Sequence, residues 1–534
     1  MNTKQTLINL VKANVKIIQV ISYETLLIHA NLVSTARDLS RNLYLWNRVD
    51  GIKKWHDDKS TFVTEDEDIR TAEKIFDFFN KENNIILLLE DFHPDLDNGH
   101  KAIKYLRNVA MDNNKFKRTL ILSQPFRFLP RELEKEVHVM ELPYPSFNDL
   151  EAILQKVCEI HKVTIPQNPS KLIEAALGLT IIEAEKAFSL AYIETLAYIE
   201  NGRLTDTEIP LIIREKESVI KKSGYLEYFH PKESMADVGG LDNLKDWLHK
   251  RGRAFDKGAA DFGLDYPRGI LLLGIPGTGK SLTAKAIGNH WQFPLLRLDM
   301  GKIFGGIVGE SEKNIAGALH IAEAIAPSIL WIDEIEKAMS GAASSGQTDG
   351  GTTSRVLGTF LTWLQEKKKP VFVVATANDI SKLPPELLRK GRVDEIFFVD
   401  LPTQEEREQI LTIHLKKKGR TPSDFDITKL AKESKGFSGA ELEEVVKEAL
   451  FQAFDYGRQL EDEDLFNALS KTYPLAKTMA EVIGEMRKWA KSRAVNASST
   501  EPELFDDWKD DDTPKLQQES YNNPFIEKSS KSKS

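Results

Sequence analysis

Short apolar runs alternate with longer mixed stretches in the N-terminal third of the chain. β-Branched and aliphatic residues fill 15–21, 42–46, 85–89 and 119–122, and polar or turn-forming residues bound each run. Runs of this length and composition predict buried strands, and the stretch at about 26–39 has the spacing of a helix. Strands that alternate with helices predict a parallel sheet covered on both faces.

The same alternation returns in the second half of the chain. Apolar runs at 269–273, 328–332 and 371–377 predict three more buried strands, separated by stretches long enough for helices. We therefore expect an α/β module over 234–402. Helical stretches are expected to follow over 403–472.

Two parts of the chain resemble each other in sequence. The stretch 129–133 (LPREL) corresponds to 383–387 (LPPEL), and each is followed by a strand pattern and an acidic helix. Further on, 178–180 (GLT) corresponds to 436–438 (GFS), again ahead of a Glu-rich helix. Similarity at matching offsets predicts two copies of one structural module.

The second copy contains a glycine-rich turn between a strand and a helix. Residues 274–281 (GIPGTGKS) fit the P-loop pattern, in which backbone N–H groups and a helix N-terminus surround phosphate oxygens. Lys280 is expected to reach the β- and γ-phosphates, and Ser281 to ligate Mg²⁺. An ordinary strand-to-helix turn would also satisfy this short pattern, but the motifs downstream disfavour it. The nucleotide contacts expected here are Gly274, Ile275, Pro276, Gly277, Thr278, Gly279, Lys280, Ser281 and Leu282.

Two acidic residues, Asp333 and Glu334, end the next apolar run. Asp333 is expected to hold Mg²⁺, directly or through water, and Glu334 to act as general base on the attacking water. The same pair could instead cap the following helix. Its position downstream of a P-loop favours the catalytic interpretation, that of a Walker B motif.

Three further polar residues complete the predicted catalytic set. Asn378 ends a strand, where its side chain could orient the water, although asparagine at a strand end is also common turn chemistry. Arg389 and Arg392 lie beside a glycine, and arginines supply the bidentate positive charge that a phosphoryl-transfer transition state requires. A solvated basic turn is the alternative for this pair. We expect both arginines to act on the nucleotide of a neighbouring subunit.

The first copy lacks the residues for this chemistry. In place of the P-loop it has 22–25 (SYET), without a glycine to admit phosphate or a lysine to bind it. Glu90 and Asp91 occupy the place of the acidic pair, and without a phosphate cradle we favour a relic or a solvated strand end over a metal site. We therefore predict a degenerate module over 1–200, joined by a charged linker at 201–233 that forms a bridging helix and then an irregular segment.

Composition excludes several classes of protein. The chain has 534 residues, 41% of them hydrophobic, which is enough for several domains with buried cores. The net charge of −9 comes without a broad basic patch, so nucleic acid is not expected as a partner. The single cysteine, Cys158, excludes an internal disulfide, and no apolar run approaches the length of a membrane helix. A soluble intracellular protein is expected.

Together, the P-loop, the acidic pair, Asn378, the two arginines and the segment 436–440 (GFSGA) resemble the AAA family of ring-forming ATPases. The resemblance is strong over 236–469 and weaker over the first 200 residues. It implies α/β modules with helical lids, ATP and Mg²⁺ as ligands, and hydrolysis at the interfaces of a ring, commonly a hexamer. Gly439 and Ala440 would belong to the nucleotide-sensing segment of the lid.

Upstream of the P-loop, Gly239 and Gly240 either make a simple turn or place backbone against an adenine ring. The order of a degenerate module and an intact one is similar to that of an AAA subfamily encoded in cyanobacterial and algal plastid genomes. That similarity implies a location in the cyanobacterial cytoplasm or the plastid stroma, and a connection with photosynthetic metabolism.

Relatives that thread polypeptides carry an aromatic residue in a pore loop. Here Ile307 takes that place, with Phe304 nearby, and Ile307 could contact a client or anchor its own loop. Two functions therefore stay open. One is an ATPase motor that remodels a protein client, and the other is an ATP-controlled assembly scaffold with slow turnover.

Two stretches are predicted to lack regular structure. The segment 340–354 is rich in Gly, Ser and Thr, which predicts a mobile loop. At the end of the chain, 473–534 is expected to form a helix and then a disordered tail from about Asn496. That tail has few aliphatic residues, an acidic cluster and a Ser/Lys end.

Overall fold

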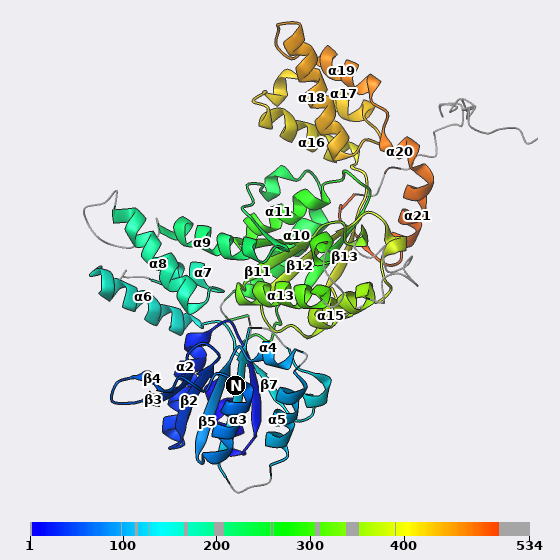
Figure 1. Cartoon of the computed structure of the whole chain (residues 1–534). Coiled ribbons are helices and arrows are strands. Elements are labelled where there is room, and N and C mark those ends of the chain that lie inside the picture. Colours follow the sequence, from blue (N-terminus) through cyan, green and yellow to red (C-terminus); the bar gives the residue numbers. More distant parts are fainter. Residues whose placement is uncertain are drawn as a thin grey trace, which may run out of the picture. The chain divides into compact units, whose positions relative to one another are not determined.

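The computed structural model of the chain describes residues 3–97, 99–112, 116–125, 128–164, 169–196, 208–256, 258–259, 261–304, 310–337, 352–389, 391–500 and 503. The chain divides into two compact units, one made of 1–228 with 317–326 and the other of 229–316 with 327–534 (Figure 1). Each unit is considered by itself. Within the described ranges, no helix is both long enough and apolar enough to cross a membrane.

The first copy of the module forms an α/β sheet followed by a group of helices. Its elements in chain order are α1 (Thr3–Lys12), β1 (Ile17–Ile21), α2 (Thr25–Asp38), β2 (Asn42–Asn47), β3 (Gly51–His56), β4 (Thr61–Asp66), α3 (Ala72–Lys81), β5 (Ile85–Glu90), α4 (His93–Leu96), α5 (His100–Ala110), β6 (Arg118–Gln124), β7 (His138–Glu141), α6 (Phe147–His161), α7 (Ser170–Ala176), α8 (Ile181–Leu196) and α9 (Ile209–Lys222).

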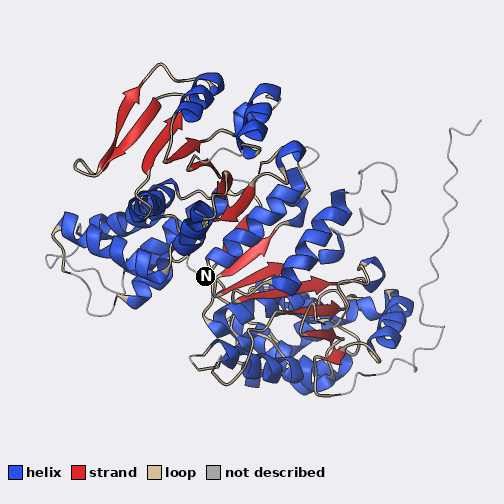
Figure 2. Cartoon of the chain, turned by 90° about the horizontal axis from the view of Figure 1, so that it is seen from below, coloured by secondary structure: helices blue, strands red, loops and turns tan. Residues whose placement is uncertain are grey.

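The first sheet has the strand order β4-β3-β2-β5-β6-β1-β7, and helices (blue in Figure 2) flank its strands (red). The strands β2, β5, β6, β1 and β7 pair in parallel, as predicted. The expectation of a wholly parallel sheet is wrong at one edge, because β3 and β4 pair antiparallel. Their connections are too short for a crossover, so consecutive strands here can only form hairpins.

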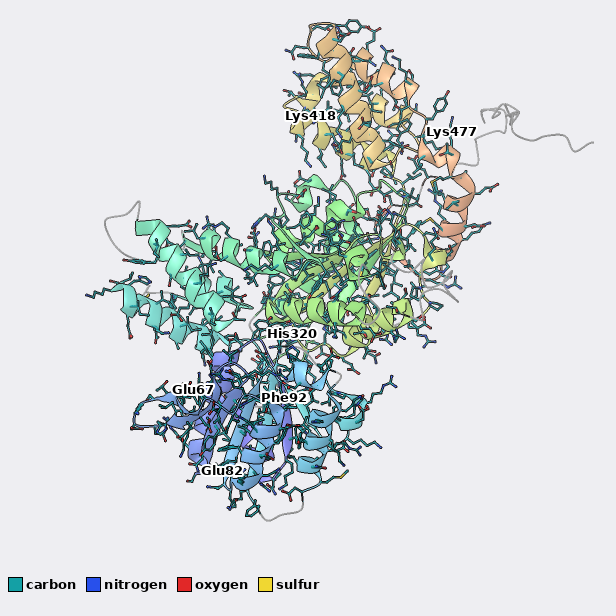
Figure 3. All side chains as sticks on the ribbon, viewed as in Figure 1. Glu67, Glu82, Phe92, His320, Lys418 and Lys477 are labelled. Atoms are coloured by element: carbon teal, nitrogen blue, oxygen red, sulfur yellow. The ribbon has the colours of Figure 1, made fainter. Side chains whose placement is uncertain are left out.

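Apolar side chains are buried on both faces of the first sheet, whereas most charged side chains lie at the surface. Phe92 is 1% exposed and packs in the core beneath the first sheet, whereas Glu67 and Lys418 lie at the surface (Figure 3). One side of the first sheet packs on α3 and α5, and the other on α1 and α2. The parallel strands are therefore buried on both faces, which is why their sequences read as continuous apolar runs.

The stretch expected to be a linker contains a structural helix. In α9, Ile212 and Ile220 are buried, and Ile212 packs in one core with α6, α7 and α8. Lys216 lies between them, donates to the Ala175 carbonyl at 3.2 Å, and burial lowers its pKa to about 7. The buried residues of this helix recur every four positions, which places them on a single helix face. The charged composition of the helix gave no sign that this face is buried.

The second copy repeats the architecture of the first. Its elements, from the strand that precedes it, are β8 (Leu226–Phe229), α10 (Asp242–Gly252), β9 (Gly269–Gly274), α11 (Lys280–Trp291), β10 (Leu295–Leu298), α12 (Met300–Ile303), α13 (Glu310–Ala324), β11 (Ser328–Ile332), α15 (Thr352–Glu366), β12 (Val371–Ala377), β13 (Glu395–Val399), α16 (Gln404–Lys417), α17 (Ile427–Glu433), α18 (Gly439–Asp455), α19 (Asp462–Lys471), α20 (Leu475–Thr478), α21 (Ala480–Ala490) and β14 (Val495–Asn496).

The second sheet has the order β14-β13-β9-β12-β11-β10-β8. Its central series β13-β9-β12-β11-β10 matches the series β7-β1-β6-β5-β2 of the first sheet, strand for strand in chain order. Two sheets with one connectivity are what an internal duplication produces. The predicted fold, an α/β P-loop module with a helical lid preceded by a degenerate copy, is confirmed.

The lid of the second copy is a compact helical group. Helices α16, α17, α18 and α19 enclose one apolar core that includes Leu411, Leu430 and Val446. Capping boxes begin two of them, with Thr403 and Glu406 at α16 and Ser438 and Glu441 at α18. Each box satisfies two N–H groups that the helix itself leaves free, so the residue at which each helix begins is well defined.

The C-terminal tail begins later than expected. Asn496, predicted as its first residue, lies in β14, which pairs in parallel with β13, and the next residue, Ala497, is fully buried. An edge strand presents unpaired N–H and C=O groups, and a short polar segment can bind them without apolar side chains of its own. The composition of this segment therefore gave no signal of its structure. Residues 501, 502 and 504–534 lie outside the described part.

A glutamate occupies the place of the P-loop in the first copy. Glu24 precedes α2, is 3% exposed, and accepts a hydrogen bond of 2.9 Å from the Ile181 backbone N–H at the start of α8. Burial, aided by the nearby charges of Glu183 and Asp149, raises the pKa of Glu24 to about 7. A carboxyl group here joins the sheet to the helices of its own unit.

Replacing Glu24 tests this junction. Folding raises the pKa of Glu24. The contribution of this shift to the free energy of unfolding is therefore fully present below about pH 4.5 and is lost as pH rises through about 7. Glu24→Gln keeps an oxygen for Ile181 but carries no charge. We expect it to stabilise the first unit at pH 8 by about 1–2 kcal/mol, discounted for screening, and to change little at pH 5.

The measurement is hydrogen exchange of α2 and α8 amides in the full-length chain, corrected for intrinsic rates. Glu185→Gln is the control, because Glu185 lies on α8, the helix whose first N–H binds Glu24, and pairs with Lys156 at the surface. Equal protection of wild type and Glu24→Gln at pH 8 would contradict the assignment.

Candidate functional site

A pocket of about 500 Å³ lies at the carboxyl ends of β9, β11 and β12, bounded by α16 and the N-terminus of α18. In open α/β sheets, ligands bind at this edge. Most of the residues predicted from sequence meet here. Those that line the pocket are Gly239, Pro276, Gly277, Thr278, Gly279, Lys280, Ser281, Leu282, Asp333, Glu334, Asn378, Gly439 and Ala440.

The glycine-rich turn adopts backbone that only glycine takes readily. Gly277 and Gly279 have φ of +78° and +90°. Lys280, at the start of α11, is buried and donates to the carbonyls of Gly274 and Ile275 at 2.8 and 2.7 Å. Burial lowers the pKa of Lys280 to about 8. An anion that replaced these carbonyl contacts would find a poorly solvated cation and several backbone N–H groups.

Gly274 and Ile275 take part through their backbones. The Ile275 side chain is fully buried in a small cluster with Leu401 and Ala476. A Cβ on Gly274 would lie 2.0 Å from the Val399 carbonyl oxygen. Both residues therefore set the start of the turn rather than line its cavity.

The Asp333 carboxylate connects two neighbouring elements to its own strand. Its Oδ1 accepts from the Ser281 hydroxyl at 2.8 Å and from the Thr376 hydroxyl at 2.6 Å. The Thr376 hydroxyl also accepts from the Glu334 backbone N–H at 2.9 Å. These bonds fix the ends of β11 and β12 against the first turn of α11.

Glu334 extends into the pocket from a strained backbone. Its φ is +50°, which is unfavourable for a residue with a Cβ and persists where the surroundings impose it. Its carboxylate accepts from Asn378 Nδ2 at 3.3 Å and pairs with Lys337. The Asn378 backbone N–H donates to the buried Glu336 at 3.0 Å. Glu334 and Asn378 are thus side by side, as the predicted roles require.

The oxygen donors suit a magnesium ion. Ser281 and Asp333 offer a hydroxyl and a carboxylate within hydrogen-bonding distance of each other. Mg²⁺ usually binds one or two protein oxygens and completes its octahedron with phosphate oxygens and water. No group of three or more His, Cys, Asp or Glu side chains in the described ranges is placed to hold a metal ion by itself.

The other end of the pocket is apolar and is formed by backbone and lid. A Cβ on Gly239 would come within 2.6 Å of Ile410 Cγ1, so helix α16 packs directly on this glycine. His414, one turn further along α16, lines the same wall, and burial lowers its pKa. The backbone of Gly239 and the aliphatic side chains of Ile410 and Ile413 form a wall that suits a heterocyclic base.

The lid touches the glycine-rich turn through the start of α18. The Ala440 backbone N–H donates to the Gly277 carbonyl at 3.0 Å, and Gly439 approaches the same oxygen. A Cβ on Gly277 would lie 2.8 Å from the Ser438 hydroxyl oxygen, which is too close for a side chain at this position. A ligand in the turn would therefore contact the lid as well as the sheet.

The two arginines do not join the pocket of their own chain. Arg389 is exposed, and the Arg392 guanidinium donates to the Leu361 carbonyl on α15. Neither lines the cavity. Their service to a neighbouring subunit remains a prediction. The pore-loop residue Ile307 and residues 340–351 of the predicted mobile loop lie outside the described residues, so the expectations for them also remain predictions. The loop prediction is wrong for 352–354, which begin helix α15, where Thr352 and Thr353 are buried.

Sequence reasoning missed several residues of the site. Thr376 was hidden within an apolar strand, although it lies two positions before Asn378 and so points to the same side of the sheet. The α16 residues Ile410, Ile413 and His414 have helical spacing, but no sequence rule says which lid face meets a ligand. The residues that line the pocket without having been predicted are Asp237, Val238, Thr376, Ile410, Ile413, His414 and Glu443.

Family models match four consecutive parts of the chain. Residues 270–401 match the ATPase family associated with various cellular activities (AAA), and 424–467 match the AAA+ lid domain. In the first copy, 3–142 match the N-terminal domain of SpoVK-like AAA ATPases and 148–223 match their second domain. The second of these matches ends just beyond α9.

Curated relatives cover nearly the whole chain. A protein of Guillardia theta is 38% identical over 92% of this chain and 95% of its own length. A protein of Pyropia yezoensis is 40% identical over 86% of this chain and 92% of its own length. A protein of Trieres chinensis is 39% identical over 87% of this chain and 91% of its own length. All three carry the name "Uncharacterized AAA domain-containing protein ycf46".

The arrangement predicts a single nucleotide site per chain. Lys280→Ala removes the only cation of the glycine-rich turn and should abolish binding of a fluorescent ATP analogue by the full-length chain. Lys285→Ala is the control, since Lys285 lies on the same helix, pairs with Glu233 and does not line the pocket. Titration should give one equivalent bound for wild type and for the control. Stoichiometric binding by Lys280→Ala would mean that the first copy also binds nucleotide.

Proposed function

The chain belongs to the AAA family of ATPases, and from that premise we propose that it hydrolyses ATP with Mg²⁺ at its second module and couples this reaction to the remodelling of a protein client. The observation that carries the proposal is the joined cluster of Ser281, Asp333, Thr376, Glu334 and Asn378 beside the glycine-rich turn. A binding-only module would have no need of a carboxylate held next to a polar amide.

Each residue has a separate task in this proposal. Lys280 and the turn bind the phosphates, while Ser281 and Asp333 hold the cation, which neutralises charge on the phosphate oxygens. Glu334 takes the proton of the attacking water through its carboxylate, and Asn378 orients that water and the carboxylate. The lid closes the far side through Ala440, so ligand binding and lid position are linked.

Replacing the base separates binding from turnover. Glu334→Gln leaves Asp333 and Ser281 intact, so ATP should bind and persist while turnover falls by about two to four orders of magnitude. Bound nucleotide and phosphate release are measured on the same sample, with Glu366→Gln, an exposed change on α15, as control. Near-normal turnover in Glu334→Gln would show that another group activates the water.

In the proposed ring, each subunit places Arg389 and Arg392 at the nucleotide site of its neighbour. An arginine that acts in trans is worth about 10³–10⁵ in rate, so Arg389→Ala should bind ATP and hydrolyse it slowly. Arg389 is the better test than Arg392, because Arg392 also donates to the carbonyl of Leu361. Mixing Arg389→Ala with Lys280→Ala subunits should restore part of the activity, since some interfaces then join an intact P-loop to an intact arginine. A mixture no more active than its parts, although subunits exchange, would rule out a shared site.

An assembly scaffold with slow turnover is the second candidate. The observation that favours it is Glu24, which stands in the place of the P-loop in the first copy and accepts a hydrogen bond from the start of α8. The glycines and the lysine of a phosphate cradle are missing from this stretch. ATPase rate with and without unfolded protein separates the two candidates, because only a remodelling motor is stimulated by a client. We further propose a ring, commonly a hexamer in this family, and a location in the plastid stroma or cyanobacterial cytoplasm, with a role in photosynthetic metabolism.

A further inference from the structure

A C-terminal segment crosses the second unit outside the parts matched by family models. We call residues 475–500 together with 503 the C-terminal strap. It contains α20, α21 and β14, and begins beyond 467, where the lid match ends. The proposed function assigns it no task. Its contacts nevertheless lead step by step to the nucleotide pocket.

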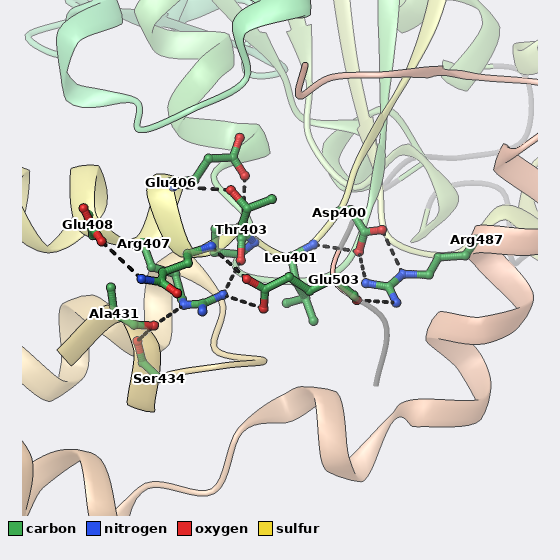
Figure 4. A network of polar contacts seen from close by, with 12 residues as sticks. Asp400, Leu401, Thr403, Glu406, Arg407, Glu408, Ala431, Ser434, Arg487 and Glu503 are labelled. Atoms are coloured by element: carbon green, nitrogen blue, oxygen red, sulfur yellow. Dashed lines mark hydrogen bonds and ion pairs between the residues drawn. The ribbon is translucent and has the colours of Figure 1, made fainter. Parts of the chain in front are cut away.

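The first attachment lies at the end of β13. Arg487 of α21 donates to both carboxylate oxygens of Asp400, at 2.8 and 2.9 Å (Figure 4). The Asp400 side chain is 5% exposed, so this bidentate pair is largely withdrawn from water. The Ala497 backbone N–H donates to the Phe398 carbonyl at 2.9 Å. The strap is thus anchored immediately before the connection that leads from the sheet into the lid.

The second attachment caps the first lid helix. Glu503 accepts from the Gln404 backbone N–H at 2.9 Å and from Arg407 at 3.1 Å (Figure 4). Arg407 is 1% exposed and also donates to the carbonyls of Pro402 and Ala431. A carboxylate at a helix N-terminus is favoured by the helix dipole. The strap therefore holds both sides of the sheet-to-lid connection.

The third attachment caps α10, the helix that follows the glycine pair. Its N-cap residue is Leu241, whose side chain cannot accept a hydrogen bond. The Ala497 carbonyl accepts instead from the Leu244 backbone N–H at 3.1 Å. Asn243 Nδ2 donates to the strap carbonyls of Asn496 and Ser498, at 3.1 and 2.8 Å. The strap supplies the caps that the sequence of α10 lacks.

One carboxylate then joins the strap to the pocket. Glu406 Oε1 accepts from the Ser498 hydroxyl at 2.6 Å and from the Leu241 backbone N–H at 3.2 Å. A Cβ on Gly240 would lie 2.1 Å from that same oxygen. Leu241 has φ of +58°, a strained value for leucine. The turn that contains Gly239 therefore lies directly against a carboxylate that the strap holds in place.

We propose that the C-terminal strap is a positioning segment of the nucleotide site, acting through Ser498 and Glu406 on the turn of Gly239, Gly240 and Leu241. Gly239 lines the wall of the pocket that suits the base, so the strap controls how firmly that wall is held and how fast nucleotide leaves. The inference rests on the proposed nucleotide site and adds a control of its exchange. If Glu406 moves, the Leu241 backbone loses a hydrogen-bond acceptor that helps to hold it at its unfavourable positive φ.

Two adjacent serines allow a matched test in the full-length chain. Ser498→Ala removes the hydroxyl that holds Glu406, whereas Ser499→Ala removes one that reaches only the exposed Asp242 at 3.3 Å. Ser498→Ala should release a fluorescent ADP analogue about three to ten times faster, because only part of the free energy of one hydrogen bond to a carboxylate is transmitted to the nucleotide wall. Ser499→Ala should match wild type, and Ser498→Thr, which keeps a hydroxyl, should restore slow release.

Hydrogen exchange without nucleotide gives a second readout. The amides of Gly240 and Leu241 should exchange faster in Ser498→Ala than in Ser499→Ala, while α18 and α19 stay unchanged. Equal release rates and equal exchange in the two variants would overturn the proposal. So would a uniform loss of protection throughout the lid, because that would make the strap a general support. If wild type binds no nucleotide, the proposed function is wrong, and exchange at Gly240 and Leu241 still decides whether the strap positions the turn.

Discussion

The second module depends on one half-buried acceptor, the Asp333 carboxylate. By accepting from Ser281 and Thr376, it holds the strand of the acidic pair, the neighbouring strand and the helix after the glycine-rich turn in one arrangement. Glu334 follows it at φ +50°, and its backbone N–H is bound by the same Thr376 hydroxyl. A low-dielectric edge makes such bonds strong and leaves little freedom for reorganisation, which is the condition for efficient electrostatic catalysis.

The first module shows what remains when that chemistry is lost. The strand connectivity is unchanged, and Asp91, which follows β5 as Glu334 follows β11, has the same φ of +50°. The backbone at this strand end therefore does not depend on phosphate binding. Glu24 takes over one role of a bound anion, since its carboxyl accepts from the first N–H of α8, a helix of the separate helical core of the same unit. That this module is a structural or recognition domain remains a prediction.

The lid of the second module is held from both ends. Inside the pocket, Ala440 binds the glycine-rich turn, and outside it the C-terminal strap binds Asp400, Arg407 and Glu406 around the sheet-to-lid connection. Lid position and nucleotide occupancy are coupled wherever one set of contacts spans both elements. The buried ion pairs of the strap are costly to break singly, because the remaining charge would be left without a partner.

The sequence by itself determined the repeated α/β fold and most of the catalytic set, because both depend on local patterns. Buried parallel strands read as apolar runs, and the glycine-rich pattern of 274–281 marks the strand-to-helix turn at which the pocket lies. It could not place Thr376, Ile410 or His414 in the site, nor show that 209–222 and 495–500 are integral to the two units. Those residues carry ordinary compositions, and their roles arise from partners far away in the chain, such as Asp333, Gly239 and Glu406. Only the tertiary structure decides such pairings, because a hydrogen bond or a glycine contact depends on which surfaces fold against each other.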